Sequence, residues 1–246
     1  MRVTILGTGA ACPRAGGACS GFLVRGENAT VWLDAGNGTL SRLLEHVSCF
    51  DLDALVISHS HADHISDVLP FMYGLGFADE PVQDFPVYAP PDVPPIVSAP
   101  LGSGSIDIFR RVFDFSTTGP VFEVGDLRFE PFRTVHPVET YGYRISEGDR
   151  TFVYTSDTAP FPELADCCRD ADLLLCEATF VHPMPSPPDI HMWAEEAGQM
   201  AQKAGAPRLL LTHVWPTIPL EAAVQEAASA YTGSVEAAAE GTTYTV

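Results

Sequence analysis

The sequence is poor in basic residues. It holds 13 Lys and Arg against 32 Asp and Glu, with Lys203 as its single lysine, and its formal net charge is −19. Proteins that bind long nucleic acids usually carry a basic patch that displaces counterions from the phosphates. The few basic residues are scattered along this chain, so we expect no long nucleic-acid partner. A small anion held directly by metal ions is compatible with this charge.

Cysteines and long apolar runs are also scarce. The six cysteines form no CxxC pair, which argues against a cysteine-based zinc site. The apolar run at the start of the chain is short and broken by glycines, so we expect no signal peptide. No apolar run is long enough to span a bilayer. We therefore expect a cytoplasmic protein with reduced thiols and no membrane partner.

The length and composition are those of a globular protein. A chain of 246 residues with 46% hydrophobic residues can bury one sizeable core, and we expect a single domain over residues 1–246. Apolar alternation predicts strands over 3–6, 21–25, 30–34, 54–58, 86–89, 112–116, 126–135, 141–146, 151–156, 172–177, 208–212 and 242–246. Helical periodicity predicts helices over 37–47, 66–77, 160–169, 193–205 and 219–230, and proline-rich composition predicts loops over 90–104 and 181–190. This mixture indicates two sheets with helices outside them.

A dense group of metal-binding residue types follows one predicted strand. The segment SHSHADHISD at 58–67 contains His59, His61, Asp63 and His64. Residues two apart in extended backbone point the same way, so His59 and His61 can hold one metal ion together. The turn that follows lets Asp63 and His64 face a second ion. Imidazole and carboxylate are ligands that zinc and similar ions prefer, so this spacing favours a metal site over a surface histidine cluster.

Three more residues of these types come just after predicted strands. His136 follows the strand at 126–135, Asp157 follows 151–156, and His213 follows 208–212. Sites in α/β proteins collect at one edge of a sheet, where the strands end. Each residue alone is weak evidence, because strand ends often carry turn residues. Together with the first cluster they complete two coordination spheres.

On these residues the chain resembles the metallo-β-lactamase superfamily over nearly its whole length. The resemblance implies an α/β fold of αββα type, a sandwich of two mixed β-sheets with outer helices. It also implies two divalent metal ions, with zinc expected first and manganese or iron as alternatives. The implied ligands form two groups around one bridging carboxylate: His59, His61 and His136; Asp63, His64 and His213; and Asp157 between them. The DAG turn at 34–36 resembles an early turn of the family, where Asp34 would support the site.

Two further segments resemble the ribonuclease Z branch of this superfamily. They are the glycine-rich opening at 6–24 and the sequence EATF at 177–180 followed by DIHMWAEEAG at 189–198. In that branch a histidine at the start of the later helix reaches the scissile phosphate, and His191 matches it. The next two residues are Met and Trp where the branch often has a small hydroxyl residue, which predicts a different substrate pocket.

One departure from that branch bears on the substrate. Its tRNA-processing members carry a long arm between the third histidine and the bridging aspartate, whereas the interval from His136 to Asp157 has room for a hairpin only. The missing arm and the acidic charge disfavour tRNA maturation. The compact chain resembles instead the phosphodiesterases of this branch, including bacterial enzymes that hydrolyse cyclic nucleotides. A phosphonate-linked group with a cysteine-rich zinc site is not favoured, because only Cys12 and Cys19 lie near that region.

These observations predict a metal-dependent hydrolase that acts on small phosphodiesters such as cyclic nucleotides. His191 is expected to stabilise charge on the phosphoryl oxygens, and His191 or Asp63 to move the proton to the leaving oxygen. A thioesterase or lactonase would share all seven ligands without needing His191, and a tRNA-processing ribonuclease is less favoured. The resemblance also implies a homodimer. The sequence leaves open the natural substrate, the physiological metal, and whether His182 and the loop at 181–190 touch substrate.

Overall fold

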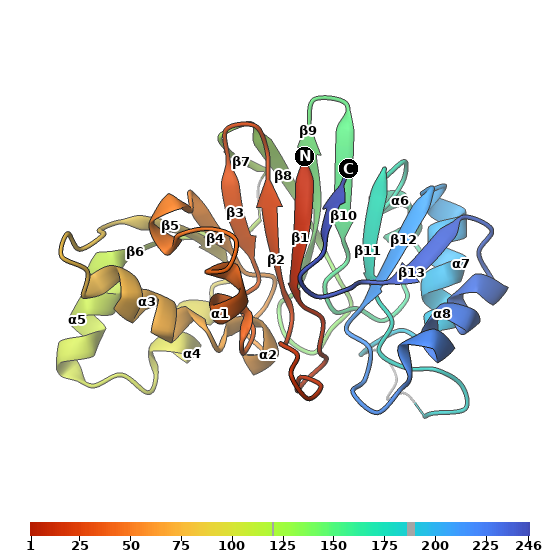
Figure 1. Cartoon of the computed structure of the whole chain (residues 1–246), viewed down its shortest axis with the longest axis horizontal. Helices are drawn as coiled ribbons and strands as arrows, with labels where there is room; N and C mark the ends of the chain where they lie inside the picture. Colours follow the sequence, from red (N-terminus) through yellow and green to blue (C-terminus); the bar gives the residue numbers. More distant parts are fainter. Residues whose placement is uncertain (120, 186–189) are drawn as a thin grey trace.

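Two seven-stranded β-sheets pack face to face, and helices cover their outer faces (Figure 1). The structure is a computed structural model that describes residues 1–119, 121–185 and 190–246. Both sheets contain parallel and antiparallel pairs. The predicted αββα sandwich of two mixed sheets is therefore confirmed.

The first sheet has the strand order β14-β1-β2-β3-β4-β5-β6. Its strands are β1 (Arg2–Gly7), β2 (Gly21–Arg25), β3 (Thr30–Leu33), β4 (Ala54–Val56), β5 (Phe85–Ala89), β6 (Phe113–Thr117) and β14 (Thr243–Thr245). The helical segments that follow its strands are α1 (Thr39–Leu43), η1 (Cys49–Asp51), α2 (Ala62–Ile65), α3 (Val68–Gly76), α4 (Val93–Ser98) and α5 (Ser103–Val112).

The second sheet has the order β13-β12-β11-β10-β9-β8-β7. Its strands are β7 (Phe122–Val124), β8 (Leu127–Arg133), β9 (Tyr141–Glu147), β10 (Arg150–Tyr154), β11 (Leu173–Glu177), β12 (Arg208–Thr212) and β13 (Ser234–Ala237). Its helices are α6 (Leu164–Cys167), α7 (Ala194–Ala204) and α8 (Leu220–Ser229), which lie on the opposite side of the molecule from α3 and α5 (Figure 1).

Central strands are apolar on both faces because each face packs on a different core. In β3, Val31 and Leu33 face the core between the sheets, while Trp32 packs with the helices of the first half. In β11, Leu175 faces the core between the sheets and Leu174 the core beneath α7 and α8. Alternate residues of a strand point to opposite faces of the sheet. Each of these continuous apolar runs therefore contributes side chains to two cores.

The structure corrects several predicted element boundaries. Residues 90–104, expected as a loop, contain all of α4 and the start of α5. The helix expected over 37–47 is reduced to α1, which begins after Gly38 in the left-handed conformation. The predicted loop at 181–190 has no helix or strand in its described part, and its residues 186–189 lie outside the described residues. Within the described chain, no helix is long and apolar enough to cross a membrane.

The topology brings the ends of several strands to one place. β10, β11 and β12 are parallel neighbours, so their carboxyl ends meet at the same edge of the second sheet. The loop after β4 crosses to that edge, since Tyr141 at the start of β9 donates its amide hydrogen to the Ser58 carbonyl at 3.1 Å. The segment after β12 also pairs with the loop after β1, through a bridge between Val214 and Gly9. Side chains from both sheets therefore converge at the seam between them.

Candidate metal centre

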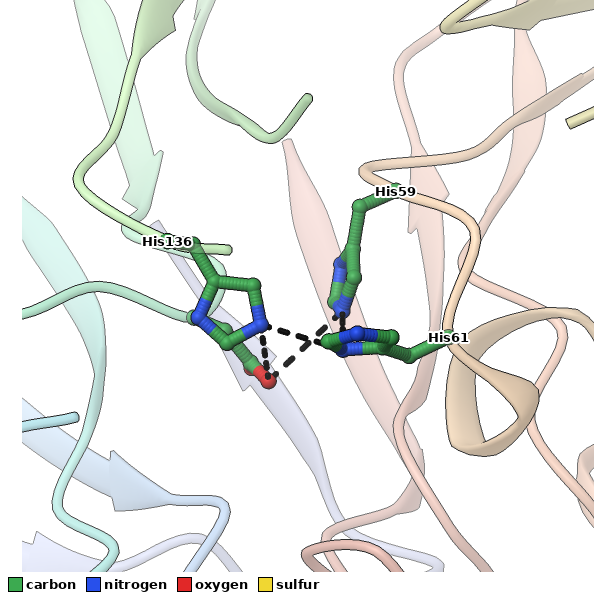
Figure 2. Close-up of side chains that lie close together, drawn as sticks. His59, His61 and His136 are labelled. Atoms are coloured by element: carbon green, nitrogen blue, oxygen red, sulfur yellow. Dashed lines mark hydrogen bonds and ion pairs between the residues drawn. The ribbon is translucent and has the colours of Figure 1, made fainter. Parts of the chain in front are cut away.

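Three histidines from two sheets meet at this seam. His59 and His61 follow β4, and His136 follows β8; Figure 2 shows their rings pointing toward one another. The His61 Nδ1 atom lies 3.1 Å from His59 Nε2 and 3.0 Å from His136 Nε2. Three ring nitrogens this close face a common point, as the ligands of one metal ion do.

A second group lies beside the first and is built from Asp63, His64 and His213. Asp63 Oδ2 lies 3.2 Å from His213 Nε2 and 3.6 Å from His64 Nε2. All three side chains are buried, and the amide hydrogen of Ala11 is donated to Asp63 Oδ2 at 2.8 Å. This amide comes from the glycine-rich opening of the chain, which thus forms part of the wall of the site.

Asp157 is shared by the two groups. Its Oδ2 atom lies 3.7 Å from His59 Nε2 and 3.8 Å from His136 Nε2 in the first group, and 3.3 Å from His213 Nε2 in the second. Its Oδ1 atom lies 3.4 Å from His64 Nε2. The structure therefore brings all seven predicted ligands together, with Asp157 in the bridging place, and their binding of metal stays a prediction.

Hydrogen bonds fix which ring nitrogen faces the centre in three of the histidines. Nδ1 of His64 donates to the Asp34 carboxylate at 2.8 Å, and Nδ1 of His136 donates to the Ile190 carbonyl at 3.0 Å. Nδ1 of His59 donates to the Ser58 hydroxyl at 3.0 Å. A ring whose Nδ1 carries the proton presents the lone pair of Nε2, which is the arrangement that orients histidine ligands in metal sites.

Burial and charge set the protonation of the cluster. Burial lowers the pKa of His59, His61 and His136, which favours the neutral imidazole that binds metal ions. Burial opposes ionisation of Asp157, but neighbouring His213 and His64 hold the pKa of its carboxyl well below the usual range. Burial also opposes the charged form of His64, but Asp157, Asp34 and Asp63 outweigh it and raise the pKa of His64, so a metal ion would have to displace the Nε2 proton of His64. The first group thus offers neutral nitrogens and the shared group an anionic oxygen.

The hydrogen bonding of two buried atoms shows whether this set of donor atoms fits metal ions. His64 Nε2 and Asp157 Oδ1 lie 3.4 Å apart, and neither makes a hydrogen bond among the described residues. Buried polar atoms are normally satisfied, because leaving one without a partner costs about 1–3 kcal/mol. Both atoms face the centre of the second group, where a divalent cation would satisfy them. The two His/Asp clusters are therefore suited to binding divalent metals.

Asp34 is a support of the site rather than a ligand. Its carboxylate accepts hydrogen bonds from the Ser58 amide at 2.7 Å, the Ser58 hydroxyl at 2.8 Å, His64 at 2.8 Å and the Tyr154 hydroxyl at 2.9 Å. Asp34 is fully buried and adopts a left-handed backbone with φ of 58° directly after β3. Strained backbone of this kind is frequent at functional sites. The carboxylate connects the two sheets and holds His64 in place.

His191 stands beside both groups and is held by a buried glutamate. Its Nδ1 atom lies 2.9 Å from Glu177 Oε1, and its ring centroid is 5.2 Å from that of His136 and 5.1 Å from that of His213. Burial lowers the pKa of His191, but the Glu177 carboxylate outweighs this effect and raises the pKa to about 9. His191 is therefore positioned as a cation next to the cluster.

Glu177 also orients the predicted ligand His213, through Thr179. Its Oε2 atom accepts the Thr179 hydroxyl at 2.8 Å, and the Thr179 oxygen in turn accepts Nδ1–H of His213 at 2.9 Å. The Thr158 amide donates to Oε1 at 2.6 Å. Although Glu177, His191 and His213 lie close enough to hold an ion, both oxygens of Glu177 are already occupied by donors. We therefore assign Glu177 to support and not to metal binding.

A pocket of about 330 Å³ opens onto the second group. Its described walls are Ala10, Ala11, His61, Ala62, Asp63, Asp157, Thr179, His191, His213 and Trp215. His182 is not among them: it is exposed, its Nδ1 atom lies 3.1 Å from Glu226 Oε1, and its ring stacks on Trp193 at 5.1 Å between centroids. The structure thus places His182, whose role the sequence left open, outside the described walls of the pocket, and Trp215 on them.

The αββα sandwich and the paired His/Asp groups at its seam together define a hydrolase of the metallo-β-lactamase type. Residues 29–214 match the Beta-lactamase superfamily domain. The probable metallo-hydrolase YhfI of Bacillus subtilis is 32% identical over 251 residues, which cover 98% of each chain. The crystal structure of YhfI matches with a TM-score of 0.88 and 28% identity, and covers 99% of each chain. The chain belongs to the β-lactamase superfamily and is a metal-dependent hydrolase.

Two further comparisons concern the branch. Ribonuclease Z of Halorubrum lacusprofundi is 28% identical over 87% of this chain and 86% of its own. A solved diphosphatase of the PhnP family shares the fold, with a TM-score of 0.74 at 19% identity over 100% of this chain and 97% of its own. The resemblance to ribonuclease Z, predicted from the segments at 6–24 and 177–198, is confirmed by the first of these.

Proposed function

We propose that this hydrolase cleaves small phosphodiesters, cyclic nucleotides foremost, with two divalent ions of which zinc is the first candidate. The observation that carries the proposal is His191, fixed by buried Glu177 at the edge of the metal centre. A cationic imidazole beside the ligand cluster suits a substrate that brings negative oxygens there. Hydrolysis of a thioester or lactone has no need of such a group.

The roles of the chain's own residues follow from their contacts. Divalent ions, when bound in such a site, lower the pKa of water and withdraw charge from phosphoryl oxygens. His191, held through Nδ1, presents Nε2 to a phosphoryl or leaving oxygen and can donate a proton there. Asp63 is ionised because His64 and His213 counter the effect of burial on its pKa. Asp63 lines the same pocket as His191, and one of these two residues would move the proton to the leaving oxygen.

The dimensions of the site support a small substrate. The chain between His136 and Asp157 forms the hairpin of β9 and β10, with no room for the arm of tRNA-processing relatives. The pocket of about 330 Å³ has no Lys or Arg among its described walls. A relative named ribonuclease Z supports cleavage of phosphodiester bonds, while the hairpin and the charge of −19 argue for small substrates over tRNA.

The test is a substrate panel assayed with zinc, with manganese and with chelator. It contains a nitrophenyl phosphodiester, cyclic AMP, a precursor tRNA, a thioester and a lactone. We expect metal-dependent turnover of the nitrophenyl diester and cyclic AMP, and no cleavage of the tRNA. Turnover of the thioester or lactone alone would mean that the metal centre serves another hydrolysis and that His191 has no phosphate to contact.

Two properties of the whole protein belong to this proposal. We propose a reducing, cytoplasmic environment, because all six cysteines are free thiols and three of them are buried. We also propose the homodimer implied by the ribonuclease Z resemblance, which light scattering of the purified protein tests directly.

A further inference from the structure

The pocket has one large apolar side chain on its described walls. Trp215 follows the ligand His213 by two positions and is half-buried. The other apolar wall residues are the alanines Ala10, Ala11 and Ala62. Because these are small, space remains next to the indole. With no Lys or Arg on the described walls, a substrate must be recognised away from its phosphate by apolar or polar contacts.

Hydrogen bonds hold the backbone of Trp215 in place. Its amide donates to the Thr179 carbonyl at 3.0 Å, and its own carbonyl accepts the Ile218 amide at 2.9 Å, which closes a tight turn. Thr179 is also the residue that orients His213. The tryptophan is therefore tied to the same support as a metal ligand.

Arg14 clamps this turn from the glycine-rich opening of the chain. Its guanidinium donates to the Trp215 carbonyl at 3.2 Å, the Pro216 carbonyl at 2.8 Å and the Ile218 carbonyl at 2.6 Å. Three carbonyl partners use the fixed fork of donors that arginine presents and lysine lacks. Arg14 is not among the described pocket walls, so its part in binding would act through Trp215.

A second aromatic ring lies next to the indole. The Phe180 centroid is 6.4 Å from that of Trp215 with an interplanar angle of 30°, and 6.0 Å from the His191 ring. Phe180 is buried, whereas Trp215 is accessible from the pocket. An indole backed by a buried ring and exposed to a cavity offers a flat apolar surface to a ligand.

We propose that Trp215 is the platform on which the planar group of the substrate, a nucleobase or aryl ring, stacks, and that Arg14 positions this platform. This proposal rests on the proposed phosphodiesterase function. It predicts that the enzyme prefers phosphodiesters that carry a planar group. Every base has a π-face, so such stacking binds nucleotides with little dependence on the base.

Binding of AMP and ribose phosphate to the zinc-loaded protein, measured by calorimetry, separates the platform from the phosphate site. The two ligands share sugar and phosphate, and only AMP has a planar base. We expect the Trp215→Ala protein to bind AMP roughly 5- to 150-fold more weakly, which corresponds to the ~1–3 kcal/mol of one base–aromatic stack. Binding of ribose phosphate should remain unchanged.

Three further variants sharpen the comparison. Trp215→Phe should restore most of the AMP affinity, because the smaller ring still stacks. Trp193→Phe is the matched control, since that tryptophan packs on His182 and donates its indole N–H to the Met184 carbonyl; it should bind AMP as the wild type does. Arg14→Gln should weaken AMP binding in the same direction as Trp215→Ala while sparing ribose phosphate.

The outcomes distinguish this inference from the function on which it rests. Equal losses for AMP and ribose phosphate in Trp215→Ala, or no loss for either, would overturn the platform even if phosphodiesters are hydrolysed. A selective loss of AMP binding in a protein that hydrolyses no phosphodiester would support the platform and refute the proposed activity. An unchanged AMP affinity in Arg14→Gln would show that Arg14 does not position Trp215 for binding.

Discussion

At the scale of single residues, the buried carboxylates of the site differ in how many hydrogen bonds their oxygens accept from the protein. Asp34 and Glu177 accept four hydrogen bonds each from protein groups. Asp157, in contrast, has an oxygen with no hydrogen-bond partner among the described residues. A saturated carboxylate orients its neighbours, whereas one with an unsatisfied oxygen facing histidine nitrogens is ready to bind a cation.

The support role of Asp34 predicts a loss of metal affinity when its charge is removed. Asn tolerates the left-handed backbone at this position, so Asp34→Asn isolates the carboxylate from the turn. Because the amide cannot accept all the bonds that hold His64, we expect zinc affinity to fall ~10- to 100-fold. Competition with a chromophoric chelator measures this, with exposed Asp79→Asn as control. Unchanged affinity would show that Asp34 does not orient His64.

The role of His191 can be tested by substitution, with the exposed His182 as the control position. Removing a positioned proton donor typically lowers turnover ~10²- to 10⁴-fold, so we expect this loss in kcat for His191→Ala on a phosphodiester. Metal content should be unchanged, because His191 is bonded to Glu177 and not to a ligand. His182→Ala should keep wild-type activity, since this side chain is exposed, pairs with Glu226 and is not on the described pocket walls. Steady-state kinetics with metal analysis of both variants checks this, and an active His191→Ala enzyme would refute the role.

The sequence could identify the predicted ligands and the support Asp34, but not the partners that the supporting residues contact, for a physical reason. His59, His61, Asp63 and His64 lie within one short segment, so their spacing alone predicts convergence. The bonds from Asp34 to Tyr154 and from Thr179 to His213 join residues far apart in the chain. Such pairs depend on how the sheets pack, which periodicity does not specify.

At the scale of secondary-structure elements, the structure departs from the predicted loop at 90–104 because its prolines and a glycine lie at the starts of helices. Pro94 and Pro95 stand in the first turn of α4, where proline removes no helical hydrogen bond and its fixed φ suits the helix. Gly102 precedes α5 in extended conformation and so begins the helix rather than ending it. The short edge strands β7 and β13 gave too little alternation to be recognised.

Packing of α7 on α8 yields a prediction in which two effects have opposite sign. Replacing a helical Gly by Ala normally stabilises by ~0.5–1 kcal/mol. A Cβ on Gly198 of α7, however, would lie 2.3 Å from the Ala227 carbonyl oxygen of α8. We expect the clash to win and Gly198→Ala to lower the free energy of unfolding by ~1–3 kcal/mol.

The control for this variant is Gly74→Ala on α3, where a Cβ would meet nothing within 4 Å. Because only helix propensity acts there, this variant should be more stable than the wild type. Urea denaturation of the three proteins measures both effects. A stabilised Gly198→Ala protein would mean that α7 and α8 pack less closely than the structure shows.

At the scale of the whole molecule, the metal centre depends on the assembly of both sheets. His59 and His61 come from the first sheet, and His136, Asp157 and His213 from the second. Neither sheet alone supplies all the residues of either group of predicted ligands. The core between the sheets, with Phe22, Tyr143 and Tyr154 among its largest fully buried side chains, therefore fixes the geometry of the site.

The most direct test is to titrate metal-free protein with zinc while following hydrolysis of a nitrophenyl phosphodiester. Two adjacent groups that share Asp157 predict that activity is absent without metal, rises as zinc is added and stops rising at two equivalents per chain. The Asp157→Ala protein should bind zinc weakly and stay inactive at the same equivalents. Full activity in the metal-free protein, or no activity after two zinc ions are bound, would contradict the assignment of this chain as a dinuclear phosphodiesterase.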